Sequence, residues 1–230
     1  MLTEYESRLT EYLSSFATEK RLERINGVLD QRTDYITVVL EDIFQPHNAS
    51  AVLRSCDGFG IQNVHIIENR NHFKPNREVD MGTSQWLSIN RSTAPKGKRL
   101  TKQTLNALKA DGYRIVATTP HTDDVDLEAF DLSAGKTAIV LGTELEGISE
   151  DVYECADEYL KIPMFGFVES FNISVACAMI LHHLSWKLRS SDIDWKLSDD
   201  RRAEILLSWL RGTIKSADSL EQRFRETEKL

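Results

Sequence analysis

The sequence predicts an α/β fold in which helices cover both faces of a mostly parallel sheet. Short β-branched, apolar segments such as residues 36–40 alternate with segments of helical periodicity. This alternation is typical of parallel sheets, because two parallel strands need a crossover connection that is usually a helix. The length of 230 residues is sufficient for one such domain with additional helices at its ends.

Composition is that of a globular protein, with 41% hydrophobic and 28% charged residues. No apolar run approaches membrane-spanning length, and the acidic N-terminus is unlike a signal peptide, so we expect a cytoplasmic protein without a membrane partner. Cys56, Cys155 and Cys177 have no metal-ligand spacing, and we interpret them as reduced thiols rather than a zinc site. The net charge of −8 means that a nucleic-acid partner would require a local basic surface.

Residues 3–31 are expected to form two helices that are separated near Ala17 and Thr18. In the second helix Arg21, Arg24 and Arg32 gather beside the apolar stripe. Two interpretations stay open for these arginines. They form either a solvated face paired with neighbouring glutamates or a ridge that binds phosphates.

The other elements follow in order along the chain. Strands are expected at residues 36–40, 64–67, 86–89, 114–118, 138–141 and 159–162. Helices are expected from a cap at Asn48 to Gly60, over about ten residues ending near Gly112, and at 149–156, 173–188 and 199–215. Residues 69–85 are predicted to be irregular, 95–99 to form a basic loop, and 216–230 to fray. The helix at 173–188 is apolar on more than one face, which favours burial against a partner as well as its own sheet.

Small and polar residues follow three of the strands, in the segments 46–55, 141–149 and 162–176. Ligands of open α/β sheets bind at the carboxyl ends of strands, so we expect these loops to form one site. Simpler interpretations exist for single residues. Ser170 and Asn172 are ordinary helix caps, and Arg54 has the spacing for a surface pair with Asp57.

These three segments together resemble the SPOUT class of RNA methyltransferases, and specifically its TrmH (SpoU) family of tRNA guanosine 2′-O-methyltransferases. The first motif runs from Asn48 to Arg54, the second is Gly142-x-Glu144-x-x-Gly147, and the third joins residues 162–164 to residues 170–176. The resemblance covers residues 20–190. Three motifs in order at family-like spacing are specific, although each one alone would be weak.

The resemblance implies a C-terminal trefoil knot, a homodimer, S-adenosylmethionine as cofactor and a guanosine of the tRNA D-loop as substrate. By motif position, the residues implied at the reaction are Asn48, Arg54, Glu144, Ser170 and Asn172. Those implied at the cofactor are Thr118, Gly142, Ile162 and Phe171, and no metal is required. Since a guanidinium normally stays protonated, we interpret Arg54 first as a clamp for a phosphate or hydroxyl group.

The predicted organisation has three parts. Residues 1–33 form a helical extension that contacts tRNA, 34–190 the methyltransferase domain, and 191–230 a C-terminal helical extension. Two alternatives remain: a ribosomal-RNA ribose methyltransferase of the same fold, and a non-catalytic RNA-binding module. The first would usually carry a separate RNA-binding domain, and the second would not need the complete set of reaction-side residues.

Overall fold

The computed structural model describes residues 2–73, 81–119, 124–143 and 146–228, and it divides the chain into two compact units. One unit is the central segment Thr33–Trp195. The other combines the two ends of the chain, Met1–Arg32 and Lys196–Leu230. The predicted limits at residues 33 and 190 differ from these by one and five residues. The two terminal extensions, which we predicted as separate parts, belong to one unit.

The central unit contains a seven-stranded sheet with the order β3-β2-β1-β6-β4-β7-β5. Every pairing between its described strands is parallel. The strands are β1 (Ile36–Glu41), β2 (Asn63–Glu68), β3 (Ser88–Thr93), β4 (Arg114–Thr118), β5 (Val125–Asp126), β6 (Thr137–Leu141) and β7 (Glu158–Lys161). All carboxyl ends therefore lie at one edge of the sheet, as the α/β prediction required.

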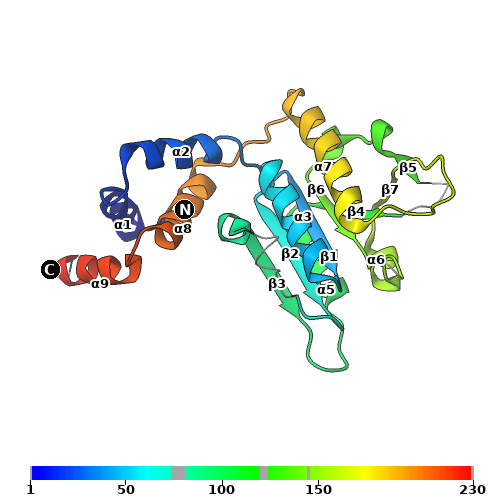
Figure 1. Cartoon of the computed structure of the whole chain (residues 1–230), viewed down its shortest axis with the longest axis horizontal. Helices are drawn as coiled ribbons and strands as arrows, with labels where there is room; N and C mark the ends of the chain where they lie inside the picture. Colours follow the sequence, from blue (N-terminus) through cyan, green and yellow to red (C-terminus); the bar gives the residue numbers. More distant parts are fainter. Residues whose placement is uncertain (1, 74–80, 120–123, 144–145, 229–230) are drawn as a thin grey trace. The chain divides into compact units, whose positions relative to one another are not determined.

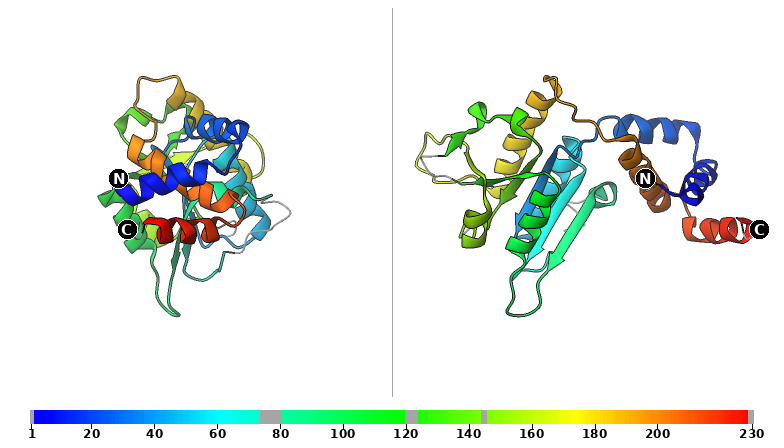
Figure 2. Two further views of the ribbon diagram at one scale, coloured as in Figure 1. Left: turned by 90° about the vertical axis from the view of Figure 1, so that its left-hand side faces the viewer. Right: turned by 180° about the vertical axis from the view of Figure 1, so that it is seen from behind.

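Helices cover both faces of this sheet. The helices α3 (Pro46–Gly58) and α7 (Ile173–Arg189) pack side by side on one face, and α5 (Thr101–Ala110) and α6 (Glu150–Cys155) on the other (Figures 1 and 2). Successive side chains of β1 point to opposite faces of the sheet and so belong to two different hydrophobic cores. Val38 and Leu40 belong to the core under α3 and α7, whereas Val39 belongs to the core under α5 and α6.

Two local predictions in the central unit were wrong. The strand expected at 86–89 runs instead from Ser88 to Thr93, and Trp86 ends a short 3-10 helix, Thr83–Trp86. Asn48 does not cap α3, because Pro46 takes the first turn and Gln45 precedes it as the cap residue. Proline suits the first helical turn, where its missing N–H has no partner to lose. Two further 3-10 turns, Leu127–Ala129 and Leu132–Ala134, were not predicted.

The terminal unit consists of α1 (Glu4–Ser14), α2 (Glu19–Leu29), α8 (Asp199–Thr213) and α9 (Ala217–Glu228). The break between α1 and α2 is as predicted, and Thr18 caps α2. The prediction that residues 216–230 fray was wrong for α9. Phe224 stacks on Tyr12 of α1, and Glu221 pairs with Arg211 of α8. These partners are distant in sequence, so local charge content could not indicate them.

Candidate active site

Three adjacent strands, β6, β4 and β7, end at the same place on the carboxyl edge. The loops that follow them contain the second and third motifs and the residues after Thr118. The sheet therefore brings together segments that are more than 40 residues apart in sequence. The order β1-β6 places the first motif, which follows β1, next to the second.

The loop after β6 is closed on itself. Thr143 and Gly147 exchange two backbone hydrogen bonds of 2.8 and 3.0 Å, and Gly147 has a positive φ of 68°. A Cβ atom at Gly142 would lie 2.2 Å from the carbonyl oxygen of Gly147, so only glycine fits there. Glu144, the acidic residue of this motif, lies outside the described residues.

The first and third motifs are joined by a hydrogen bond between side chains. Asn172 Nδ2 donates to Asn48 Oδ1 at 3.2 Å, across 124 residues of sequence. Asn172 is also the N-cap of α7, where its Oδ1 accepts from the backbone N–H of Ser174 at 2.9 Å. The cap interpretation and the site interpretation of Asn172 are thus compatible, because its two amide atoms serve different partners.

Arg54 and Ser170, which we also predicted at the reaction side, are exposed. Arg54 lies on the outer side of α3, six residues after Asn48 and thus about 120° from it around the helix. Ser170 and Phe171 are exposed in the segment before α7, and Ser170 makes no side-chain hydrogen bond to another described residue. Within one chain the structure joins Asn48 to Asn172 by a side-chain hydrogen bond, and it places Arg54 and Ser170 at exposed positions.

Thr118 and Ile162 are half-buried at the ends of β4 and β7. The hydroxyl of Thr118 donates to the carbonyl oxygen of Val140 in β6 at 3.0 Å, so this side chain is occupied within the sheet. The groups left for a ligand are the backbone at these strand ends and the apolar side chain of Phe171. Such a surface, built from backbone groups and an apolar aromatic side chain, suits an organic ligand with a flat ring better than a metal ion.

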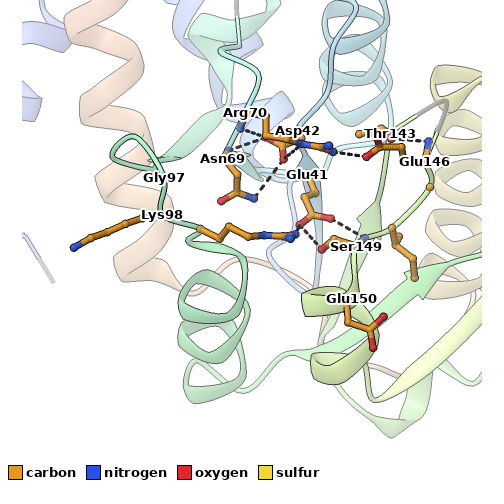
Figure 3. Close-up of a pocket in the computed structure, with 13 residues that line it drawn as sticks. Glu41, Asp42, Asn69, Arg70, Gly97, Lys98, Thr143, Glu146, Ser149 and Glu150 are labelled. Carbon is orange, nitrogen blue, oxygen red and sulfur yellow. Dashed lines mark hydrogen bonds and ion pairs between the residues drawn. The ribbon is translucent and has the colours of Figure 1, made fainter.

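A pocket of about 520 Å³ lies beside this region, at the carboxyl ends of β1, β2 and β3 (Figure 3). Two buried carboxylates form its base. Glu41 accepts from the hydroxyls of Thr101 and Ser149 at 2.6 and 2.7 Å. Asp42 accepts from the backbone N–H groups of Asn69 and Arg70 at 2.7 and 2.8 Å.

Arg70 closes one side of this pocket. Its guanidinium lies 2.7 Å from a carboxylate oxygen of Glu146, and this hydrogen bond lowers the pKa of Glu146 and raises that of Arg70. Our sequence analysis missed this pocket, since its lining comes from four separate loops. The sequence feature that could have indicated the pocket is the pair Glu41 and Asp42, two consecutive acidic residues directly after the predicted strand 36–40.

The arginines predicted to contact RNA lie in different surroundings in the terminal unit. Arg21 and Arg24 are exposed on α2. Arg32 is only 1% exposed, and its guanidinium lies 5.3 Å from the ring centroid of Trp209. The prediction that Arg32 belongs to an exposed ridge was therefore wrong. It follows the end of α2 and packs on an aromatic ring of α8, a partner that its sequence neighbours do not indicate.

Known proteins resemble this chain over most of its length. Residues 35–182 match the model of the SpoU rRNA Methylase family. A protein of Borreliella burgdorferi named tRNA (guanosine(18)-2′-O)-methyltransferase is 41% identical over 209 residues, which cover 91% of this chain and 93% of the relative. The chain belongs to the SpoU methylase family. A relative of the same name from Thermus thermophilus is 33% identical over 196 residues, which cover 84% of this chain and 97% of the relative.

Solved structures of the SpoU family share the fold described above. The crystal structure of the Aquifex aeolicus TrmH/SpoU tRNA modifying enzyme has a TM-score of 0.74 and 31% identity, and the match covers 86% of this chain and 98% of that one. The SpoU methyltransferase AviRb from Streptomyces viridochromogenes, solved in complex with AdoMet, has a TM-score of 0.58 and 24% identity over 72% of this chain and 62% of that one. The latter likeness concerns the fold alone.

The described residues include neither a membrane-spanning helix nor a cluster of metal ligands. None of the described helices combines the length and hydrophobicity needed to cross a bilayer. In the same residues, His, Cys, Asp and Glu side chains form no group of three that could hold a metal ion.

Proposed function

We propose that this protein transfers a methyl group from S-adenosylmethionine to the ribose 2′-hydroxyl of guanosine 18 in the D-loop of tRNA. The names of the relatives support the reaction and the position. The observation that carries the proposal is the hydrogen bond between Asn48 and Asn172, because it unites two of the three family motifs at one point. We expect the protein to act in the cytoplasm, where tRNA is modified.

The cofactor would lie at the ends of β4, β6 and β7. S-adenosylmethionine supplies a methyl group on a sulfonium centre that is already activated for displacement. Thr118, Gly142 and Ile162 would bind it through backbone groups, and Phe171 would provide an apolar wall. The close approach at Gly142 and the two backbone hydrogen bonds between Thr143 and Gly147 support this role, since they fix the two ends of the loop after β6.

The task left to the protein is to hold the 2′-hydroxyl in line with the methyl group, an effect that can contribute several kcal/mol. Asn48 and Asn172 would fix the loop that borders the ribose, with Ser170 and Glu144 beside it. Arg54 would hold a phosphate or the hydroxyl itself, because a guanidinium has five N–H donors and no acceptor. A base role for Arg54 would need a neighbour that perturbs it.

A homodimer completes the proposal. Val175, Met179 and Trp186 lie on one side of α7 at helical spacing, and all three are exposed. Phe165 and Phe167, in the preceding segment, are also exposed. Several exposed apolar side chains on one side of a helix are typical of a protein contact. A second copy would cover these side chains. It would also bring side chains of the partner to the carboxyl edge of the sheet, where Arg54 and Asn48 of one chain point in different directions.

The trefoil knot implied by the resemblance remains part of this proposal. So does tRNA contact by the exposed arginines of α2. The ribosomal-RNA alternative has support in the description of the family model. The two relatives described above cover 91% and 84% of this chain and are named for tRNA, and for that reason we place tRNA first.

Mass spectrometry of RNA after incubation with labelled S-adenosylmethionine tests the function directly. We expect one labelled ribose methyl at guanosine 18 of unmodified tRNA and none on ribosomal RNA fragments. Arg54→Ala should lower the rate at least a hundredfold while cofactor affinity, measured by calorimetry, changes less than about threefold. A label on ribosomal RNA alone would favour the alternative. Equal loss of transfer and cofactor binding in Arg54→Ala would make Arg54 a structural residue.

A further inference from the structure

The connection between β3 and α5 carries cations outside the three family motifs. The backbone N–H of Lys98 donates to the carbonyl oxygen of Pro95 at 2.9 Å, and Gly97 has a positive φ of 78°. These features define a β-turn with Lys96 and Gly97 at its centre, in which glycine supplies the left-handed position. Lys96 and Lys98 are both exposed. The connection projects beyond the ends of the strands in each view of the molecule (Figures 1 and 2).

The pairing of nearby charges shows which cations are available. Arg99 Nε lies 2.8 Å from a carboxylate oxygen of Asp151, and Arg70 is held by Glu146. In contrast, neither Lys96 nor Lys98 has an acidic partner within ion-pair distance among the described residues. The side chain of Lys98 extends away from the buried acids of the pocket (Figure 3). The two arginines stabilise the pocket, and the two lysines present uncompensated positive charge to solvent.

The turn also lies next to the candidate active site. Gly97 and Lys98 line the same pocket as Thr143 and Gly147, which belong to the closed loop of the second motif. A molecule bound at that loop would therefore meet the turn at the rim of the pocket. At the base of the pocket the Glu41 carboxylate lies 3.7 Å from the guanidinium of Arg99, so its charge is offset by an arginine of the pocket and not by the two lysines.

We propose that Lys96 and Lys98 bind phosphate groups of the RNA substrate and give the central unit an RNA contact of its own. The proposal rests on the function proposed above, because it takes tRNA as the ligand. Two ammonium groups on a turn suit a polyanion, since lysine binds phosphate as a point charge with little demand on orientation. A chain with a net charge of −8 requires such local cations to bind RNA.

The test compares Lys96→Ala/Lys98→Ala with two controls. Lys96→Arg/Lys98→Arg keeps the charge, and Lys136→Ala removes a lysine that precedes β6, at the opposite edge of the sheet, where it lies near Asp34. Binding of an unmodified tRNA transcript would be measured by fluorescence anisotropy between 50 and 300 mM KCl. We expect the dissociation constant of the double alanine variant to rise about tenfold at 100 mM salt, and the slope of log K against log salt to fall by about 1.5.

The control variants and the value of kcat distinguish a role in RNA binding from a structural or catalytic role of the two lysines. The arginine variant and Lys136→Ala should bind as the wild type does, and kcat at saturating tRNA should change less than twofold in the double alanine variant. An unchanged dissociation constant and salt slope would overturn the proposal. So would a loss of kcat without a loss of binding, since it would indicate a structural or catalytic role. A wild-type protein that neither binds nor methylates tRNA would instead overturn the proposed function, and this inference with it.

Discussion

At the scale of single residues, Asn172 has two roles that its sequence context shows only in part. Its Oδ1 caps α7, and its Nδ2 reaches Asn48. The sequence predicts the first role from local spacing, because a cap accepts from an N–H two residues away. The second role depends on α3 and α7 packing side by side, which is a tertiary contact.

Two substitutions of Asn172 separate these roles. Asn172→Ser should keep the cap but lose the reach to Asn48, so stability should stay within a few tenths of a kcal/mol of the wild type. Asn172→Ala should lose both and destabilise the protein by about 1 kcal/mol. We expect both variants to lose methyl transfer by roughly tenfold, the value of one net hydrogen bond at the site. Thermal unfolding and single-turnover rates provide the two measurements, and a fully active serine variant would show that the bond to Asn48 is dispensable.

At the scale of secondary-structure elements, α2 differs from the other helices of the terminal unit in how its cations are used. On α8 and α9, Arg211 and Arg225 pair with Glu221, and Arg202 pairs with Asp30. Arg21 and Arg24 have no acidic partner within ion-pair distance among the described residues. These ion pairs of α8 and α9 therefore hold the unit together, and Arg21 and Arg24 of α2 are available to an external polyanion.

This difference predicts the effect of Arg21→Ala/Arg24→Ala. Removing two available cations should raise the dissociation constant for tRNA about tenfold and lower the salt dependence of binding, measured by filter binding over a range of salt concentrations. Arg225→Ala is the matched control, because it removes an exposed arginine whose charge is already paired. If the α2 variant and the control bind tRNA equally well, α2 is not part of the RNA-binding surface.

At the scale of the whole molecule, the sheet explains why three motifs far apart in sequence act at one edge. The parallel order places β1, β6, β4 and β7 next to one another, so the loops that follow β1, β6 and β7 and contain the three motifs lie at the same edge. The same architecture leaves the outer face of α7 uncovered, and Trp186 is 73% exposed there. A surface of this kind is costly in water unless another chain covers it.

The homodimer can be tested at this exposed face. Met179→Glu places a charge on the apolar side of α7, twice in a symmetric interface, and should weaken the dimer at least a hundredfold. Sedimentation velocity over a range of concentrations measures the change, and methyl transfer should fall in parallel with the dimer fraction. Phe16→Glu serves as the control, since it alters an exposed aromatic residue just after α1. A wild-type protein that sediments as a monomer at every concentration would contradict the proposal.

The sequence alone determined the α/β class, the positions of most strands and helices, and the family. These features depend on local information. Short β-branched segments indicate strands, apolar residues at helical spacing indicate helices, and the family motifs are short segments that can be recognised directly in the sequence. Tertiary structure decided the rest. It decided that Arg32 is buried on Trp209, that residues 217–228 form a packed helix and that four loops enclose the pocket beside Lys98. Each of these depends on side chains far apart along the chain, and such pairs meet only when the sheet and the helices are assembled.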